Sequence, residues 1–178
     1  MLDCINIKSW GVDIMEKVQL AKVDDSNKTA FINLFNLFHH NRAAFLPELY
    51  CVIDEEGYYD KANTLDVLNV SSDKAQSYLI RYNDKLAGFV VFAFSPLVKQ
   101  GCDYGIVDIF VPNNYRNKGI ASGACRLLFK EFPGRYYIEV IENDHEARSF
   151  WDRFINKEGH LIEIAKAEAP LVAYAFEV

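Results

Sequence analysis

The sequence predicts a mixed α/β fold, in which a central sheet of about six to seven strands is flanked by about four helices. Two β-rich runs within residues 77–94 flank a polar turn pair, which is typical of an antiparallel hairpin. An apolar run at residues 105–111 precedes a helical pattern at 120–132 and a further strand-like run at 135–141. That order is typical of a parallel strand–helix–strand unit. Because both kinds of pairing are predicted, we expect a mixed sheet with helices packed on it.

The first elements lie in the N-terminal half of the chain. Residues 17–23 alternate in polarity and predict a strand, and residues 65–70 predict a short helix. Between them, residues 29–38 predict a helix because four large apolar residues recur at helical spacing. These residues are Phe31, Leu34, Phe35 and Phe38. We interpret this stripe as part of the core rather than as a ligand-binding face.

The remaining elements are read from apolar periodicity and turn signals. Strands are predicted at residues 77–82, 86–94, 104–111, 135–141, 160–164 and 171–176. Helices are predicted at residues 121–131 and 144–156, and Pro133 with Gly134 ends the first of them. The predicted order is strand, two helices, three strands, helix, strand, helix and two strands.

Length and composition narrow the class of protein. A chain of 178 residues favours one domain over residues 1–178, with residues 1–14 as an extension of unknown role. No apolar run is long enough to cross a bilayer, and the first residues lack the pattern of a secretory signal. We therefore expect a cytoplasmic protein with no membrane partner. The net charge of −6 argues against nucleic acid as a partner.

Metal and thiol chemistry are not indicated by the cysteines and histidines. The cysteines are scattered without a C-x-x-C pair, and the histidines show no H-x-x-x-H pattern. We therefore expect reduced thiols and no metal site.

A basic, glycine-containing loop follows the strand at residues 105–111. Arg116, Gly119 and Ala121 are spaced as R-x-x-G-x-A, directly before a predicted helix. A helix N-terminus presents unpaired backbone N–H groups and the positive end of the helix dipole. The loop is therefore predicted to bind an anion, most often a phosphate.

A second motif opens the next predicted helix, in the stretch E-N-D-H-E-A-R-S-F-W at residues 142–151. Asn143 and Glu146 stand there in capping-box order. With both motifs, the chain resembles the GNAT superfamily of acyl-CoA-dependent N-acyltransferases. The loop matches the family's Q/R-x-x-G-x-G/A pattern. Asn143, Ala147, Phe150 and Trp151 match its N-x-x-A-x-x-aromatic-aromatic pattern with one extra residue, and the resemblance extends over residues 17–176.

The resemblance implies a GNAT-like sheet and acetyl-CoA as the acyl donor. The pyrophosphate is expected on Arg116, Asn117, Lys118, Gly119, Ile120 and Ala121. The pantetheine arm and the thioester are expected on the backbone of Ile109, Phe110 and Val111, with Asn143 on the pantetheine side.

Asp108 is the sharpest candidate for a catalytic residue. An acid within an apolar strand is costly unless it is paired or solvated, and strict alternation places Asp108 on the same face as Ile106 and Phe110. The resemblance implies a general base on this strand that removes a proton from the acceptor ammonium. A buried structural carboxylate is an equally open interpretation, and Glu139 and Glu142 are weaker candidates for the base.

The general acid departs from the family pattern, because Trp151 stands where a tyrosine is usual. An indole N–H cannot protonate a thiolate at neutral pH. Other donors are water or one of three tyrosines, Tyr104, Tyr115 and Tyr137. We expect an N-acetyltransferase that acts by direct attack in a ternary complex, or alternatively a catalytically altered acyl-CoA-binding or sensor module. A phosphate-binding protein unrelated to CoA ranks last.

The acceptor is expected to be a primary amine of a small molecule or peptide. By family analogy, residues 39–60 should lie near it. Their acidic and aromatic side chains would suit a cation; these are Glu48, Tyr50, Glu55, Glu56 and Tyr58. Proteins of the family are frequently dimers, so a homodimer is compatible with the resemblance, although no residue specifies an interface.

Overall fold

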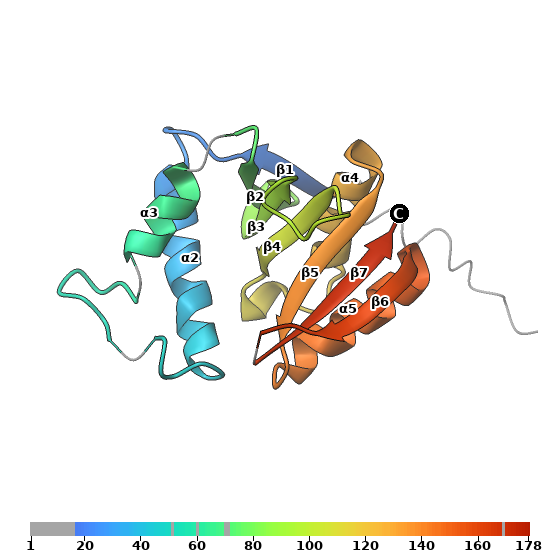
Figure 1. Ribbon diagram of the computed structural model, residues 1–178. Helices are drawn as coiled ribbons and strands as arrows, with labels where there is room; N and C mark the ends of the chain where they lie inside the picture. Colours follow the sequence, from blue (N-terminus) through green and yellow to red (C-terminus); the bar gives the residue numbers. More distant parts are fainter. Residues whose placement is uncertain (1–16, 51, 60, 70–71, 169) are drawn as a thin grey trace, which may run out of the picture.

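Within the described residues, the central sheet holds seven strands in the order β1-β2-β3-β4-β5-β7-β6 (Figure 1). The computed structural model describes residues 17–50, 52–59, 61–69, 72–168 and 170–178. Its strands are β1 (Val18–Lys22), β2 (Ala75–Tyr82), β3 (Lys85–Phe94), β4 (Tyr104–Phe110), β5 (Arg135–Ile141), β6 (His160–Lys166) and β7 (Leu171–Glu177). Its helices are α2 (Lys28–Ala43), α3 (Lys61–Asn69), α4 (Ile120–Glu131) and α5 (His145–Glu158), with a 3-10 helix η1 (Asn113–Tyr115). The expected extension at residues 1–14 lies outside the described residues.

The predicted mixed sheet is confirmed by the strand pairing. Strands β4 and β5 pair in parallel, and every other neighbouring pair of the described sheet is antiparallel. The β2–β3 hairpin turns at Asn83 and Asp84, whose φ values are 49° and 62°. Two successive left-handed residues match the twist of the flanking strands, which is why Asn and Asp favour this turn.

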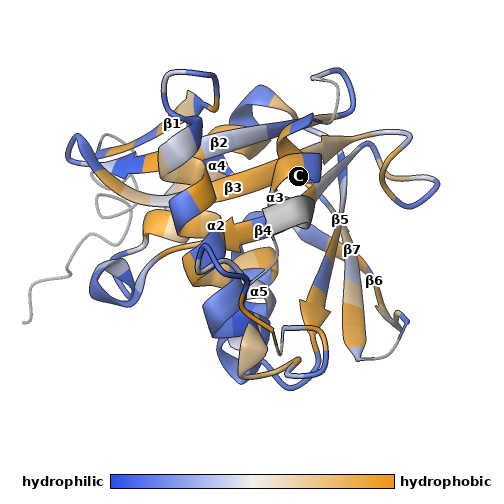
Figure 2. Ribbon diagram, turned by 90° about the vertical axis from the view of Figure 1, so that its left-hand side faces the viewer, coloured by the Kyte–Doolittle hydropathy of each residue, from blue (hydrophilic) through white to orange (hydrophobic). Residues whose placement is uncertain are grey.

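Helices cover both faces of the sheet and define two separate cores. Helices α4 and α5 pack on one face, whereas α2 and α3 pack on the other, against β2, β3 and β4 (Figure 1). The smaller core confirms the predicted aromatic stripe, because Phe31 and Phe35 of α2 contact Phe89 of β3. Hydrophobic residues concentrate in the strands, above all in β3, while the connecting loops are largely hydrophilic (Figure 2).

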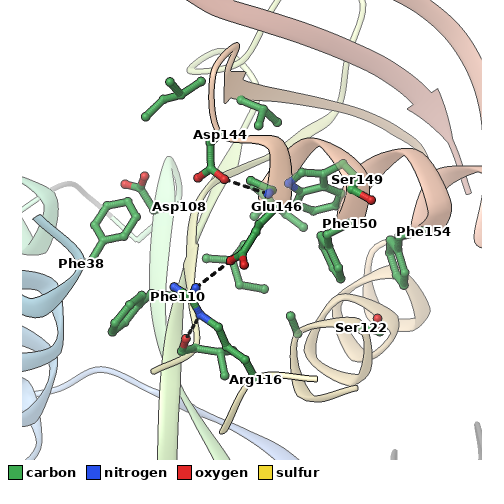
Figure 3. Close-up of a pocket in the computed structure, with 18 of the residues that line it drawn as sticks. Phe38, Asp108, Phe110, Arg116, Ser122, Asp144, Glu146, Ser149, Phe150 and Phe154 are labelled. Carbon is green, nitrogen blue, oxygen red and sulfur yellow. Dashed lines mark hydrogen bonds and ion pairs between the residues drawn. The ribbon is translucent and has the colours of Figure 1, made fainter. Parts of the chain in front are cut away.

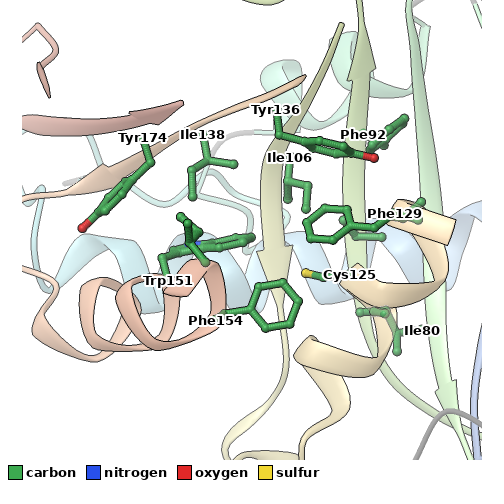
Figure 4. Close-up of a cluster of buried hydrophobic side chains, with 14 of the residues drawn as sticks. Ile80, Phe92, Ile106, Cys125, Phe129, Tyr136, Ile138, Trp151, Phe154 and Tyr174 are labelled. Carbon is green, nitrogen blue, oxygen red and sulfur yellow. The ribbon is translucent and has the colours of Figure 1, made fainter. Parts of the chain in front are cut away.

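The larger core lies between the sheet and helices α4 and α5 (Figure 4). Tyr136 of β5 is fully buried there and packs against Phe129 of α4. Its hydroxyl donates a hydrogen bond of 2.6 Å to the carbonyl oxygen of Phe132, so that this buried polar group is satisfied. Burial of rings such as these provides the main driving force that holds both helices on the sheet.

A β-bulge in β4 changes the predicted orientation of its side chains. Asp108 pairs with Val91, but the next pair joins Ile106 to Phe92, so Val107 is an extra residue in β4. One extra residue reverses the faces on its two sides. Ile106 consequently packs in the larger core, whereas Phe110 packs in the smaller core. The prediction that Asp108 shares a face with both is therefore wrong for Ile106.

Helix α2 extends beyond its predicted end at residue 38 to Ala43. The added turn contains His39, His40 and Arg42, which show no apolar periodicity. His39 is nevertheless buried and its ring lies 4.7 Å from the ring of Phe35. Tertiary packing thus continues the helix where the sequence pattern stops, and it brings Arg42 to the end of the helix beside β4.

Candidate active site

A cavity of about 1160 Å³ opens where β4 and β5 separate (Figure 3). The two strands pair only at Tyr104 with Tyr136 and at Gly105 with Tyr137. Beyond Gly105 the edge of β4 faces the cavity instead of β5, and residues 106–111 all line it. The cavity therefore contacts unpaired strand backbone, which is the feature expected of Ile109, Phe110 and Val111.

The cavity continues to the start of helix α4. Gly119, which precedes the helix, has a left-handed φ of 74°, and Asn117 has a φ of 59°. No side chain caps this helix, and its first turn carries no acidic residue. The first intrahelical bond there joins the N–H of Gly123 to the carbonyl of Gly119 at 2.9 Å. The N–H groups of residues 120–122 are thus left without helical acceptors at the cavity wall, as an anion-binding site requires.

The two basic residues of the loop, Arg116 and Lys118, differ in whether they line the cavity. Nη1 of Arg116 lies 2.9 Å from Oε2 of Glu146 in α5, and its Nε donates to the carbonyl of Val111 at 3.2 Å (Figure 3). Arg116 therefore connects the end of β4 to helix α5 in the cavity wall. Lys118 instead donates to the carbonyl of Asn114 at 2.9 Å and does not line the cavity. Of the predicted loop residues, all except Lys118 are in the cavity wall.

Asp108 lies on the α2 side of β4, opposite the α4 and α5 side of the same cavity (Figure 3). Its side chain is 11% exposed, and its Oδ1 accepts a hydrogen bond of 3.0 Å from Nη1 of Arg42. Burial raises the pKa of the Asp108 carboxyl group above its usual value, and the Arg42 guanidinium partly opposes this rise. A raised pKa makes this carboxylate a stronger base than an ordinary aspartate, as removal of a proton from an acceptor requires.

The predicted cap of the last helix is wrong by one residue. Asp144, not Asn143, precedes α5, and its carboxylate accepts a hydrogen bond of 2.9 Å from the N–H of Ala147. Asn143 is exposed in the preceding turn and is not part of the cavity wall, whereas Asp144 lines it. Counting three residues back from Ala147 reaches Asp144, so the family spacing pointed to this position even though the residue type did not.

Replacing Asp144 by alanine is expected to lower the free energy of unfolding by about 0.5–2 kcal/mol, because the N–H of Ala147 loses its acceptor. The measurement is urea denaturation followed by circular dichroism. Asn143→Ala is the matched control, and we expect it to change the stability by less than about 0.5 kcal/mol. Equal losses in the two variants would contradict the assignment of the cap.

Trp151 and the three candidate tyrosines differ in their positions relative to the cavity. Trp151 is 5% exposed and packs against Phe150 at 5.0 Å between ring centres, so it belongs to the larger core, and it also forms part of the cavity wall. Tyr104 packs among core rings, and the hydroxyl of Tyr137 donates to Glu139 at 2.7 Å. Burial raises the pKa of Tyr137 to about 12. Among the described residues, Tyr115 is the tyrosine that lines the cavity.

The two weaker candidates for the base, and the residues expected near the acceptor, can also be placed relative to the cavity. Glu139 lines the cavity, and Glu142 does not. None of the acidic or aromatic residues expected near the acceptor lines it either; these are Glu48, Tyr50, Glu55, Glu56 and Tyr58. Asn36 of α2 holds their loop, through bonds of 3.0 Å to the carbonyl of Gly57 and from the N–H of Tyr59. The N-terminal half contributes Phe38, Asn41, Arg42, Phe45 and Val67 to the cavity, and three of these, Asn41, Arg42 and Phe45, belong to the segment 39–60 that was expected near the acceptor.

The described residues show neither a cluster of metal ligands nor a membrane-spanning helix. They contain no group of three or more His, Cys, Asp or Glu side chains placed to hold a metal ion. In the same part of the chain, every helix is too short or too polar to cross a membrane.

Comparison with known proteins identifies the family. Residues 36–155 match the model of the Acetyltransferase (GNAT) family. Because this match covers more than half of the chain, the protein belongs to that family and is an acetyltransferase. No curated protein matches its sequence.

Solved structures confirm the fold. An acetyltransferase from Thermus thermophilus is 16% identical, with a TM-score of 0.64 over 91% of this chain and 97% of the other. An acetyl transferase from Salmonella typhimurium that modifies the N-terminal serine of ribosomal protein L7/L12 is 15% identical, with a TM-score of 0.58 over 91% and 95%. The microcin C7 self-immunity acetyltransferase, solved with acetyl-CoA and AMP, is 16% identical, with a TM-score of 0.61 over 92% and 93%. At these identities the similarity concerns the fold.

Proposed function

We propose that this protein transfers an acetyl group from acetyl-CoA to a primary amine by direct attack in a ternary complex. The observation that carries the proposal is that one cavity joins three features. These are the uncapped start of α4, the open edge of β4 and the buried carboxylate of Asp108. They correspond to a site for an anion, a site for an extended acyl arm and a base. The similarly folded microcin C7 protein, solved with acetyl-CoA, supports the choice of donor.

Each part of the donor has a counterpart among the described residues. The pyrophosphate would accept hydrogen bonds from the N–H groups of residues 119–122, where Gly119 allows a close approach. When the donor binds, Arg116 would leave its ion pair with Glu146 and pair with the pyrophosphate, because a doubly charged anion is the stronger partner. The pantetheine arm would lie along the edge of β4 at Ile109 and Val111.

The reaction removes two protons from the acceptor nitrogen and adds one proton to the sulfur of CoA. Asp108 would accept a proton from the acceptor ammonium, and the resulting free amine would attack the thioester carbonyl carbon. Collapse of the tetrahedral intermediate breaks the carbon–sulfur bond and releases the CoA thiolate, and the nitrogen loses its second proton to water. Tyr115, in the described cavity wall, or a water molecule would protonate that thiolate. The products are the N-acetylated amine and CoA.

Isothermal titration calorimetry with acetyl-CoA tests the proposal. We expect the protein to bind acetyl-CoA and Gly119→Val to weaken binding at least about tenfold, because a branched side chain strains the left-handed backbone and occupies the anion site. Gly101→Val is the matched control, since Gly101 also has a positive φ, 88°, but does not line the cavity. Absence of binding at millimolar acetyl-CoA would overturn the proposal.

A second candidate function is an acyl-CoA-binding module without transferase activity. The observation in its favour is Trp151, which is buried at the position where the family pattern has a tyrosine. Binding of acetyl-CoA without release of CoA in the presence of a broad panel of amines would support this candidate. Amine-dependent release of CoA, followed with a thiol reagent, would exclude it.

A further inference from the structure

We propose that the acceptor carries a carboxylate beside its amine, as an apolar α-amino acid does, and that Arg42 binds this carboxylate. The inference rests on the proposed function and specifies its acceptor. It starts from the ion pair of Arg42 with Asp108, which lies in the wall of the cavity on the α2 side of β4.

The guanidinium of Arg42 is held in place from two sides. Its Nη1 donates to Oδ1 of Asp108 at 3.0 Å, and its central carbon lies 5.1 Å from the centre of the Phe38 ring. The side chain is 26% exposed and is part of the cavity wall. Its Nε is buried and has no hydrogen-bond partner among the described residues. A preorganised guanidinium with unused donors is suited to bind a carboxylate.

The ion pair has the right polarity for a zwitterion. Within the described part of the chain, Asp108 has a hydrogen bond at Oδ1, which leaves Oδ2 available to an ammonium group. A carboxylate next to that ammonium would then lie beside Arg42. The acceptor ammonium would face the Asp108 carboxylate and the acceptor carboxylate would face the Arg42 guanidinium, so both contacts would join opposite charges. An amine with a positive charge alone would meet Arg42 as a like charge, so the pair discriminates against it.

The remaining groups at this end of the cavity are largely apolar. Phe45 and Val107, which lie close to Arg42 and Asp108 in the chain, line the wall together with Val67, and Val107 is 54% exposed. Large exposed apolar side chains beside a charged pair suit an acceptor with an apolar side chain. Glu139 is the other carboxylate of the wall, and one of its oxygens accepts the hydrogen bond from Tyr137. Asn41 adds a neutral amide next to Arg42.

Matched acceptors test the inference. Leucine, leucinamide and 3-methylbutylamine share one side chain, but only leucine carries a carboxylate. We expect the wild-type protein to acetylate leucine with a kcat/KM at least about tenfold above the values for the other two. The amide has a less basic amine than leucine and is deprotonated more easily, so amine basicity works against the expected preference for leucine over leucinamide, which is the decisive comparison. The assay follows acetyl-CoA-dependent release of CoA and identifies the N-acetyl product by mass spectrometry.

The Arg42→Gln variant isolates the role of the guanidinium. We expect the preference for leucine over leucinamide to fall to within about threefold, mainly through a higher KM for leucine, and Arg42→Lys to retain an intermediate preference. The ratio is informative even if the variant is slower overall, because a change at Asp108 affects both acceptors. Arg81→Gln is the matched control. Arg81 bonds the carbonyl of Asp84 in the hairpin turn and does not line the cavity, so it should keep the wild-type ratio.

The outcomes separate this inference from the proposed function. Failure to bind acetyl-CoA overturns the function itself. If acetyl-CoA binds, the inference alone is overturned by any of three results. These are equal or faster acetylation of the amide or the amine, no acetylation of leucine, and an unchanged leucine preference in Arg42→Gln. Faster acetylation of a peptide with N-terminal leucine than of leucine itself would also overturn it, because that peptide lacks the neighbouring carboxylate.

Discussion

Asp108→Asn is expected to lower the kcat of acetyl transfer by about 10²–10⁴-fold, because the amide cannot accept the ammonium proton. The affinity for acetyl-CoA should change by less than about threefold, because Asp108 lies on the opposite side of β4 from helix α4. Steady-state kinetics and calorimetry measure the two quantities separately. A loss of affinity with unchanged turnover would remove Asp108 from the role of base.

The same residue is expected to set the acidic limb of the pH profile. Burial raises the pKa of Asp108, so the carboxylate takes up its proton at a higher pH than an ordinary aspartate. Only the deprotonated form can act as a base. The rate should therefore be full above this raised pKa and fall as the pH decreases through it. Asp108→Asn should lose this limb, and a limb at the pKa of an ordinary aspartate would contradict the assignment.

Glu139→Gln is the matched control for Asp108. Glu139 lines the same cavity, but it is exposed and accepts a hydrogen bond from Tyr137. We expect this variant to keep its kcat within about threefold of the wild type and to retain the acidic limb. A larger loss in Glu139→Gln than in Asp108→Asn would transfer the role of base to Glu139.

Gly88→Ala is expected to lower the free energy of unfolding by about 3–5 kcal/mol. Gly88 of β3 has a φ of 152°, and a Cβ atom there would lie 2.1 Å from the carbonyl oxygen of Phe110. This obstacle is the backbone of β4 rather than a flexible side chain, so β3 and β4 would have to separate. Phe110 lines the cavity, so we also expect weaker binding of acetyl-CoA. Chemical denaturation and calorimetry measure the two effects.

Gly57→Ala separates the clash from backbone strain. Gly57 has a φ of 86°, but a Cβ atom there would meet nothing within 4 Å. We expect this control to cost about 1–2 kcal/mol from conformation alone and to leave acetyl-CoA binding unchanged. Similar losses in the two variants would show that the close contact with Phe110 does not limit the packing of β3 on β4.

Local patterns predicted the elements and the position of the glycine-containing loop well. Helix α4 begins at Ile120, within one residue of its predicted start, because the glycine before it and the apolar period after it are both local signals. The β2–β3 turn is equally local, since Asn83 and Asp84 tolerate the left-handed conformation that the turn needs. These features depend on residues that are neighbours in the chain.

The composition of the site was predicted less well, because it depends on contacts between distant residues. The bulge at Val107 is defined by the register of β4 against β3 and cannot be read from either strand alone. The choice of Asp144 over Asn143 as the cap depends on where α5 meets the sheet, since both residue types are good caps. Of the segment 39–60 that was expected near the acceptor, Asn41, Arg42 and Phe45 line the cavity, whereas its acidic residues Glu48, Glu55 and Glu56 do not.

The sequence by itself determined the family, the order of the elements and the loop of Arg116, Gly119 and Ala121, because each depends on short spacings along the chain. Only the tertiary structure decided how Asp108 is paired. Its partner Arg42 lies 66 residues away, on a turn of α2 that has no apolar period. The environment of a buried charge is set by whatever the fold packs against it, and that contact appears only when α2 lies against β4.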